Sequence, residues 1–479
     1  MHENPRRWLI LVVLCLSTLV LVIDNMALTV ALPPLAADLG ATAQDVQWVM
    51  ESYMLVFAGL LLSAGSLADR FGRRKIMIFG LVLFGAASLL ATLASSPGEL
   101  IAARVVMGVG GALVMPSTLS ILIVVFTDEA QRRKAMAVWG AVSMIGLIGG
   151  PVVGGALIAS YGWESVFLIN VPIAALAVLA ALTLMPESKG PWAKADPIGA
   201  LLSVVGMTSL VWAINEWPAH GITPAAGIAV VALGAFVAWE VRTPYPMVPL
   251  RLFRDRNFAG GSLSLTLVQV GNGGMMLVFT QYLQLVLGYT PTEAGLAFIP
   301  MAVAALLFNG VGAGLGGKLG NRVTVAIGLV VMAGAFVLLA FADGTWMLMA
   351  GQFVLGAGGG LAMPSAVAAL MGAVPPEQAG VGSALNDTIQ QAGAALGVAL
   401  LGSVATAVFT AGMPAGSPGS LAEAVTDPAL AAAARTAYDS ALTGTFLAAA
   451  AGVVAAAVVA LALMRDRKPA PVEPVAAAA

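Results

Sequence analysis

The sequence predicts an all-α membrane protein with 14 transmembrane helices, built as two pseudo-symmetric six-helix halves plus an inserted helix pair. Three observations carry this prediction: the composition, the recurrence of long apolar stretches and the distribution of basic residues. Of 479 residues, 59% are hydrophobic and only 10% are charged, whereas a soluble domain carries about 25% charged residues. This chain has too little polar surface to cover a globule in water, so we place most of it in lipid.

Long apolar stretches recur along the whole chain. Each predicts a membrane helix, because about 20 residues cross the hydrocarbon core. The first stretch follows Arg6 and Arg7 and continues without a convincing cleavage site, so we interpret it as a retained helix and not as a signal peptide. The predicted spans are 8–31, 45–66, 76–95, 99–125, 134–160, 164–185, 197–215, 222–241, 257–287, 291–316, 322–342, 346–371, 380–409 and 438–464.

The basic residues test the number of spans. An even number places both termini on one side of the membrane, and 20 of the 22 Lys and Arg then fall on that side. Arg435 lies in an opposite loop and Arg104 lies inside a span. Segments rich in Lys and Arg stay in the cytoplasm. We therefore expect a multi-pass protein of the plasma membrane with both termini in the cytoplasm.

An internal repeat lies at an offset of 248 residues. Two motifs repeat at this one offset, which indicates duplication of a six-helix unit. The predicted divisions are a first half (1–185), linkers with inserted helices 7 and 8 (186–256), a second half (257–464) and a cytoplasmic tail (465–479). The aligned residues are Leu67, Arg70, Gly72 and Arg74 with Leu315, Lys318, Gly320 and Arg322, and Gly108, Gly110, Gly111, Met115, Pro116 and Ser117 with Gly356, Gly358, Gly359, Met363, Pro364 and Ser365.

The repeat fails where the first half is charged. At the same offset the first half has charged residues and the second half has uncharged ones. The differing pairs are Asp24 and Asn272, Glu51 and Ile299, Arg104 and Gln352, and Asp69 and Gly317. The first half is therefore predicted to handle protons, and the second half to supply polar but uncharged cavity surface.

Asp24, Glu51 and Arg104 stand inside early spans at a similar depth, roughly 8–11 Å below the outer edge at about 1.5 Å per residue. Equal depth permits a buried network. Isolated charges at such a depth cost at least about 2–3 kcal/mol each, and they mark proton pathways. A carboxylate exposed alternately to each side can bind and release a proton in turn. The alternatives are a static ion pair that locks helices 1 and 4, and a Glu51 that stays wet near the interface.

The string GSLADRFGRR (65–74) lies between the second and third spans. It closely resembles the cytoplasmic loop between helices 2 and 3 of major facilitator superfamily transporters. The resemblance implies a cytoplasmic gate in which Asp69 pairs with basic side chains to hold the halves together. The alternative is a solvated loop that follows the positive-inside rule. The expected gate residues are Gly65, Asp69, Arg70, Gly72, Arg73 and Arg74.

Two further strings resemble the fourteen-helix drug:proton antiporters of this superfamily. VIDNMALTVALPPL (22–35) is similar to their helix 1 element, and LIAARVVMGVGGA (100–112) to their helix 4 element. The resemblance implies that Asp24 handles protons and that Arg104 takes part in proton transfer. Met26 and Thr29 stand where the family usually has Thr and Asn, which affects the neighbouring hydrogen bonds but not the carboxylate.

GLIGGPVVGG (146–155) resembles the helix 5 element associated with antiporters. Gly146, Gly150 and Gly154 share one helix face, and Pro151 can kink the helix. Small residues at this spacing also allow close helix packing, and we expect packing to be how they act in a rocking interface. WESVFLINVPI (163–173) and GSALNDTIQQAGAALGVAL (382–400) resemble the same antiporters.

Polar residues in the second half are candidates for a substrate cavity. The predicted set is Gln269, Asn272, Asn309 and Asp387. The alternative is hydrogen bonding between helices. Buried acids are scarce there, which favours neutral or monocationic amphipathic substrates over dications.

The combined reading is proton-coupled export of hydrophobic or amphipathic drugs or antibiotics by alternating access. A proton-coupled uptake symporter of the same fold is the alternative, and a receptor, scaffold or membrane enzyme is disfavoured. Cys15 is the one cysteine, and His2 and His220 lie apart, so we expect no metal, no cofactor and no enzymatic activity. No phosphate-binding loop indicates ATP. The expected partners are the substrate, protons and lipid but no nucleic acid, and we expect a monomer.

Overall fold

The computed structural model describes residues 6–190, 196–375 and 379–465, and this part of the chain is helical without a strand. Thirteen of its helices are long and apolar enough to cross a membrane. The remaining predicted span, 134–160, lies within the 33-residue helix α5 (Glu129–Tyr161). The structure is thus consistent with the predicted fourteen spans. Residues 466–479 of the predicted tail lie outside the described part.

The first half consists of six membrane-spanning segments. Two of its helices begin at side-chain caps that satisfy free backbone N–H groups: Thr42 and Asp45 form a capping box at the start of α2, and Ser96 accepts from the backbone of Glu99 at the start of α4. The predicted helix 164–185 is interrupted at Ile169. The elements are α1 (Arg7–Leu39), α2 (Ala43–Phe71), α3 (Arg73–Ala91), α4 (Pro97–Val125), α5, α6 (Ser165–Leu168) and α7 (Asn170–Leu184).

The inserted pair and the second half follow. Two predicted spans need correction: 291–316 is divided into two helices, and the last helix begins at Ala431, earlier than the predicted 438. The elements are α8 (Pro197–His220), α9 (Pro224–Arg242), η1 (Leu250–Arg254), α10 (Arg256–Gln281), η2 (Tyr282–Val286), α11 (Pro291–Leu296), α12 (Ile299–Leu319), α13 (Asn321–Ala340), α14 (Thr345–Met371), α15 (Ala379–Gly412), α16 (Leu421–Ala424) and α17 (Ala431–Leu463).

The packing of the second half repeats that of the first. Helix α1 packs on α5 as α10 packs on α15, and α2 packs on α4 as α12 packs on α14. The close approaches repeat as well. A Cβ added at Gly80 would lie 2.7 Å from the carbonyl oxygen of Gly110, and one added at Gly328 would lie 2.7 Å from that of Gly358. These glycines are related by the offset of 248 residues, so the predicted pseudo-symmetry of the two halves is confirmed.

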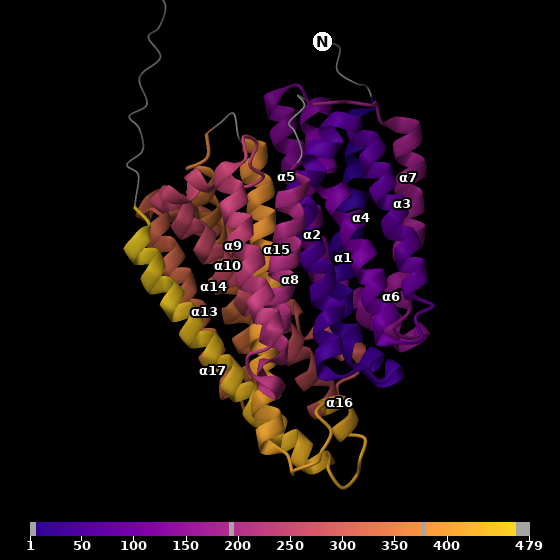
Figure 1. Cartoon of the computed structure of the whole chain (residues 1–479), viewed down its shortest axis with the longest axis vertical. Coiled ribbons are helices and arrows are strands. Elements are labelled where there is room, and N and C mark those ends of the chain that lie inside the picture. Colours follow the sequence, from indigo (N-terminus) through magenta and orange to yellow (C-terminus); the bar gives the residue numbers. More distant parts are fainter. Residues whose placement is uncertain (1–5, 191–195, 376–378, 466–479) are drawn as a thin grey trace, which may run out of the picture.

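The halves lie side by side, with the inserted hairpin α8–α9 in magenta between them (Figure 1). We call the end that carries the 70–75 loop and the 242–256 linker the basic end, and the opposite end, which carries the short helix α16, the α16 end. The seam between α2 and α15 differs at these two ends. At the basic end, Ser63, Ser66 and Val381 line a cavity of about 990 Å³ together with the linker.

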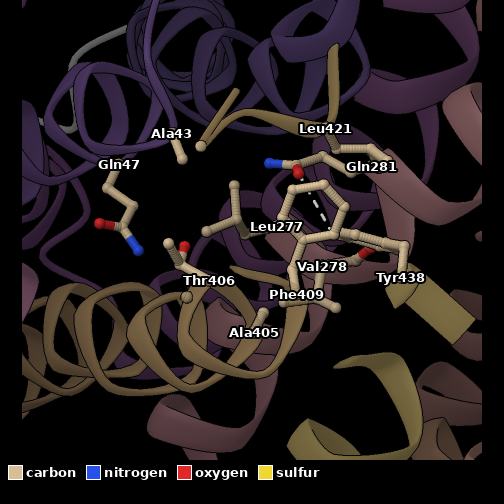
Figure 2. A pocket seen from close by; sticks show the side chains of 12 residues that line it. Ala43, Gln47, Leu277, Val278, Gln281, Ala405, Thr406, Phe409, Leu421 and Tyr438 are labelled. Atoms are coloured by element: carbon tan, nitrogen blue, oxygen red, sulfur yellow. Dashed lines mark hydrogen bonds between the residues drawn. The ribbon is translucent and has the colours of Figure 1, made fainter. Parts of the chain in front are cut away.

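The α16 end of this seam is closed. Gln47 of α2 lies against Gly402 of α15, where an added Cβ would come within 3.1 Å of the Gln47 Cδ. The cavity left there measures only about 20 Å³. Figure 2 shows this region, with Leu421 of α16 at its edge and Tyr438 bonded to Gln281. The seam is therefore sealed at the α16 end, whereas at the basic end a cavity lined by α2, Val381 of α15 and the linker lies beside it.

Candidate functional site

The fully buried ion pair of Asp24 and Arg104 is the centre of the candidate site. Both side chains are 0% exposed, and Arg104 Nη1 donates to Asp24 Oδ2. Asn170 Nδ2 donates to the other carboxylate oxygen, Oδ1, at 2.7 Å. The three residues come from α1, α4 and α7. The structure thus brings together two of the three residues that the sequence placed at a similar depth, and both carboxylate oxygens of Asp24 have a donor.

Arg104 has partners besides Asp24. Its Nε donates to the carbonyl of Val49 at 3.2 Å, and its Nη2 donates to Asn25 Oδ1 at 3.5 Å. The guanidinium carbon also lies 4.4 Å from the centroid of the Tyr53 ring, a distance at which a cation is attracted to an aromatic face. The guanidinium can therefore stay in place when Asp24 changes its protonation state.

Asn170 was not among the predicted site residues. It is 0% exposed, and its Nδ2 also lies 3.3 Å from the Ser88 hydroxyl on α3. A lone Asn in an apolar span was the available signal, because a buried amide needs partners. The sequence alone gave no indication that its partner is Asp24.

Glu51 does not join this network. It is 0% exposed, and Asn215 Nδ2 of the inserted helix α8 donates to its Oε2 at 2.7 Å. The network that equal depth permitted therefore does not include Glu51, because the side chain points from α2 to α8. The alternative of a wet interfacial Glu51 also fails, since the residue is buried.

The loop predicted as a gate is tied to its own half. Asp69 accepts from Arg73 Nε at 2.8 Å, and Arg74 Nη1 donates to the Met185 carbonyl at 2.8 Å. Gly72 joins α2 to α3 with φ +114°, a conformation that favours glycine. The Arg70 guanidinium carbon lies 5.0 Å from the centroid of the Phe71 ring. In this conformation the described bonds of Asp69 and Arg73 remain within the first half and the linker after it.

The glycine face of α5 packs on α1. Added Cβ atoms would lie 2.9 Å from Val22 at Gly146 and 2.7 Å from Ala27 at Gly154, and Gly150 lies against Met26. The same helix also reaches the second half. The Pro151 carbonyl lies against Gly295 of α11. The element thus combines tight packing within one half with contact across the halves, as expected from its small residues.

The predicted substrate residues fall into separate groups. Asn272 Nδ2 donates to Gln269 Oε1 at 3.3 Å, and Asp387 accepts from Asn386 at 3.0 Å. Gln269, Asn272 and Asp387 are half-buried, whereas Asn309 is exposed on α12. Gly65 lies in the part of α2 toward the basic end. A Cβ added there would lie 3.6 Å from the Pro116 side chain, an ordinary van der Waals distance.

Comparison with known proteins identifies the family of this chain. The family model described as Major Facilitator Superfamily matches residues 14–268 and 261–479. The multidrug efflux pump LfrA of Mycolicibacterium smegmatis is 35% identical over 95% of each chain. The puromycin resistance protein pur8 of Streptomyces alboniger is 34% identical over 85% of this chain and 84% of that protein. The methyl viologen resistance protein SmvA of Salmonella typhimurium is 32% identical over 86% of this chain and 85% of that protein.

A solved structure has the same fold. A bacterial homologue of the human lysosomal transporter Spinster, in an inward-facing and occupied conformation, superposes with a TM-score of 0.73 at 18% identity, over 98% of this chain and 100% of that one. The family match covers nearly all the chain, and the repeated six-helix packing agrees with it. The chain belongs to the major facilitator superfamily.

Proposed function

We propose that the protein exports hydrophobic or amphipathic small molecules across the plasma membrane in exchange for protons. The observation that carries this proposal is the buried Asp24–Arg104 pair, which three helices hold at 0% exposure. A carboxylate inside a membrane bundle is expensive and marks a proton or substrate pathway. The relatives named for multidrug efflux and for puromycin and methyl viologen resistance support small organic compounds as the substrate class.

The basic end is proposed to face the cytoplasm, because it gathers most Lys and Arg residues. With this orientation both termini are cytoplasmic. The sealed α16 end then faces outward and the cavity at the basic end faces the cytoplasm, as in an inward-facing transporter. The proposed unit is a monomer in the bilayer, divided as predicted at residues 185, 256 and 464. A compound from the cytoplasm enters the protein while it is in this inward-facing state.

Asp24 is proposed to carry the proton and Arg104 to regulate it. The charged carboxylate is stabilised by Arg104 and Asn170. When the outward-facing state admits water from outside, a proton on Asp24 releases the guanidinium to its remaining partners, Val49, Asn25 and the Tyr53 ring. Return to the inward-facing state delivers that proton to the cytoplasm. A charge that crosses the membrane gains about 2.3 kcal/mol per 100 mV, enough to concentrate a compound outside.

The 65–74 loop is proposed as the cytoplasmic gate in the opposite conformation. Asp69 and Arg73 now bond to each other, and closure of the basic end would bring the loop against the second half. The Gly146, Gly150 and Gly154 face supports the rocking movement, because α5 contacts both α1 and α11. Gln269, Asn272, Asn309 and Asp387 are proposed to offer polar surface to neutral or monocationic compounds.

The test is proton movement in inside-out vesicles that hold an acid-inside gradient. Adding each of a panel of dyes and antibiotics should alkalinise the lumen with the wild type and not with Asp24→Asn. Asp38→Asn is the matched control: Asp38 is an exposed acid on the same helix that accepts from Trp163 Nε1, and an amide oxygen can accept the same bond. If no compound moves protons through a folded protein, export loses its support. Acidification with substrate uptake would favour the symporter.

A further inference from the structure

The carboxyl group of Glu51 lies in the apolar interior and faces the inserted helix α8. Glu51 is 0% exposed and Asn215, its partner, is 8% exposed. Asn215 Nδ2 donates to Glu51 Oε2 at 2.7 Å. Within the described part of the chain, no cation forms an ion pair with Glu51. A buried carboxylate without a counter-charge is unfavourable, and a single amide bond does not replace the water it has lost.

Two oxygen atoms of this pair are left without partners. Among the described residues, Glu51 Oε1 and Asn215 Oδ1 are both buried and have no hydrogen-bond donor. Both atoms can only accept hydrogen bonds, so neither can donate to the other while Glu51 is ionised. A proton on Oε1 turns it into a donor, which can bond to Asn215 Oδ1 while the existing bond is kept. One proton thus completes a reciprocal pair of carboxylic acid and carboxamide.

The helices around Glu51 supply little compensating charge. On α4, Arg104 bonds to Asp24 and to the carbonyl of Val49. On α8, the neighbouring titratable residue is Glu216, half-buried and of the same sign. On α15, Asp387 is sixteen residues from Ser403, about 24 Å along the helix. The surroundings therefore favour a neutral Glu51.

This pair lies where the seam between the halves is sealed. The residue before Asn215 is Ile214, whose carbonyl accepts from the Ser403 hydroxyl of α15 at 3.0 Å. Helix α8 is thus bonded to α2 on one side and to α15 on the other, and it lies between them in Figure 1. Gln47, one turn from Glu51, packs on Gly402. The two bonds of α8 therefore bridge the helices whose contact closes the α16 end.

A cavity lies between the hairpin and α15 beside these bonds. It measures about 490 Å³, with Trp217, Ile222 and Leu400 among its lining residues. Close packing is what normally holds a membrane helix to its neighbour, and this cavity interrupts the packing beside residues 214 and 215.

We propose that Glu51 is a second proton-binding site, and that its protonated carboxyl, paired with Asn215, fastens α8 across the sealed seam between α2 and α15. The inference rests on the proton antiport proposed above and adds the inserted hairpin to it. Loss of the proton leaves a charge that must reach water, which breaks the pair and opens the α16 end. Acid conditions therefore favour the sealed state, and a rising pH favours opening. Asn215 acts as a positioning residue.

Infrared difference spectra of the full-length protein in lipid, between acid and alkaline pH, test the proton directly. The wild type should show a carboxylic acid C=O band that Glu51→Gln removes and that Asn215→Ala moves to a different frequency. Asp24→Asn should leave that band in place. Glu51→Gln preserves the hydrogen-bonding pattern of the protonated side chain, so it should fold. Spectra of Glu51→Gln identical to those of the wild type would overturn the proposal.

A distance measurement tests the fastening. Spin labels at Tyr161→Cys and Trp346→Cys, both highly exposed positions at the α16 end, in a Cys15→Ser background report the opening between the halves. The distance should increase with pH in the wild type and in Asp24→Asn, and stay short at every pH in Glu51→Gln. A normal pH response in Glu51→Gln would contradict the inference.

The partners of α8 provide the matched comparison. Asn215→Ala and Ser403→Ala should each lengthen the distance at acid pH, because each removes one bond of α8. Unchanged distances in both would show that the hairpin does not hold the seam. The vesicle assay separates this proposal from export itself: absence of compound-driven proton movement there refutes the antiport, whereas a pH-insensitive seam refutes only the role of Glu51.

Discussion

The two halves share their backbone packing and differ in their buried chemistry. The glycine contacts between α3 and α4 recur between α13 and α14 at the same 2.7 Å. Arg104 bonds to Asp24, however, whereas its counterpart Gln352, also 0% exposed, donates to the Met275 sulfur at 3.6 Å. The fold therefore does not need a charge at this position. This difference supports the proposal that the ion pair of the first half serves transport.

The largest effect on stability is expected when Arg104 of the first half is replaced by the Gln that stands at the equivalent position of the second half. Arg104→Gln leaves Asp24 as an unpaired buried charge, which should lower the free energy of unfolding by about 3–5 kcal/mol. Adding Asp24→Asn copies the second half and should recover most of that loss without restoring proton movement. Thermal unfolding in detergent measures this. A double variant as unstable as Arg104→Gln would show that the pair is a structural lock.

A second effect should be equal in both halves. Valine at Gly80 or at Gly328 overpacks a helix crossing, which typically costs about 1–3 kcal/mol. Each substitution should lower the thermal stability by a similar amount, and neither should alter the number of protons moved per compound. A large difference between the two would break the structural equivalence of the halves.

The third prediction concerns the polar surface of the second half. Asn272→Ala removes the amide that bonds to Gln269 and that is proposed to offer polar surface to compounds. One hydrogen bond of this kind contributes about 0.5–1.5 kcal/mol. The apparent affinity for some compounds should change by up to about tenfold, with proton coupling retained. Concentration dependence of dye transport in vesicles measures it. Complete loss of coupling would show that Asn272 does more than offer polar surface.

The smallest effect on stability is expected at the gate loop. Asp69→Gly copies Gly317 of the second half and removes a partly exposed ion pair with Arg73, and such pairs contribute about 0–1 kcal/mol. Thermal unfolding should hardly change, while the spin-label distance at the α16 end should shift toward the sealed state if the gate holds the opposite conformation. A stability loss well above that range would make the loop part of the folded core.

The sequence predicted the helices well and their partners less well. Apolar length and the positive-inside bias were sufficient for the spans, because lipid demands both. The break at Ile169 and the division between α11 and α12 were missed, although Pro172 and Pro300 stand in the first turns of α7 and α12 and are signals for the start of a helix. The Asp24–Arg104 pair could be anticipated from depth. The Glu51–Asn215 pair could not, because helix rotation decides which side a residue faces and the repeat has no counterpart for the insert.

The position of the hairpin has a consequence for how compounds approach within the bilayer. A bundle of two related halves has two equivalent flanks where its halves meet. Here α8–α9 lie over the flank of α2 and α15, whereas the other flank is formed by α5 and α11. One flank of the molecule is consequently covered by the hairpin, and the other flank is not. We expect lipid-dissolved photoreactive compounds to label α5 and α11 before α2 and α15, and equal labelling would contradict a one-sided entrance.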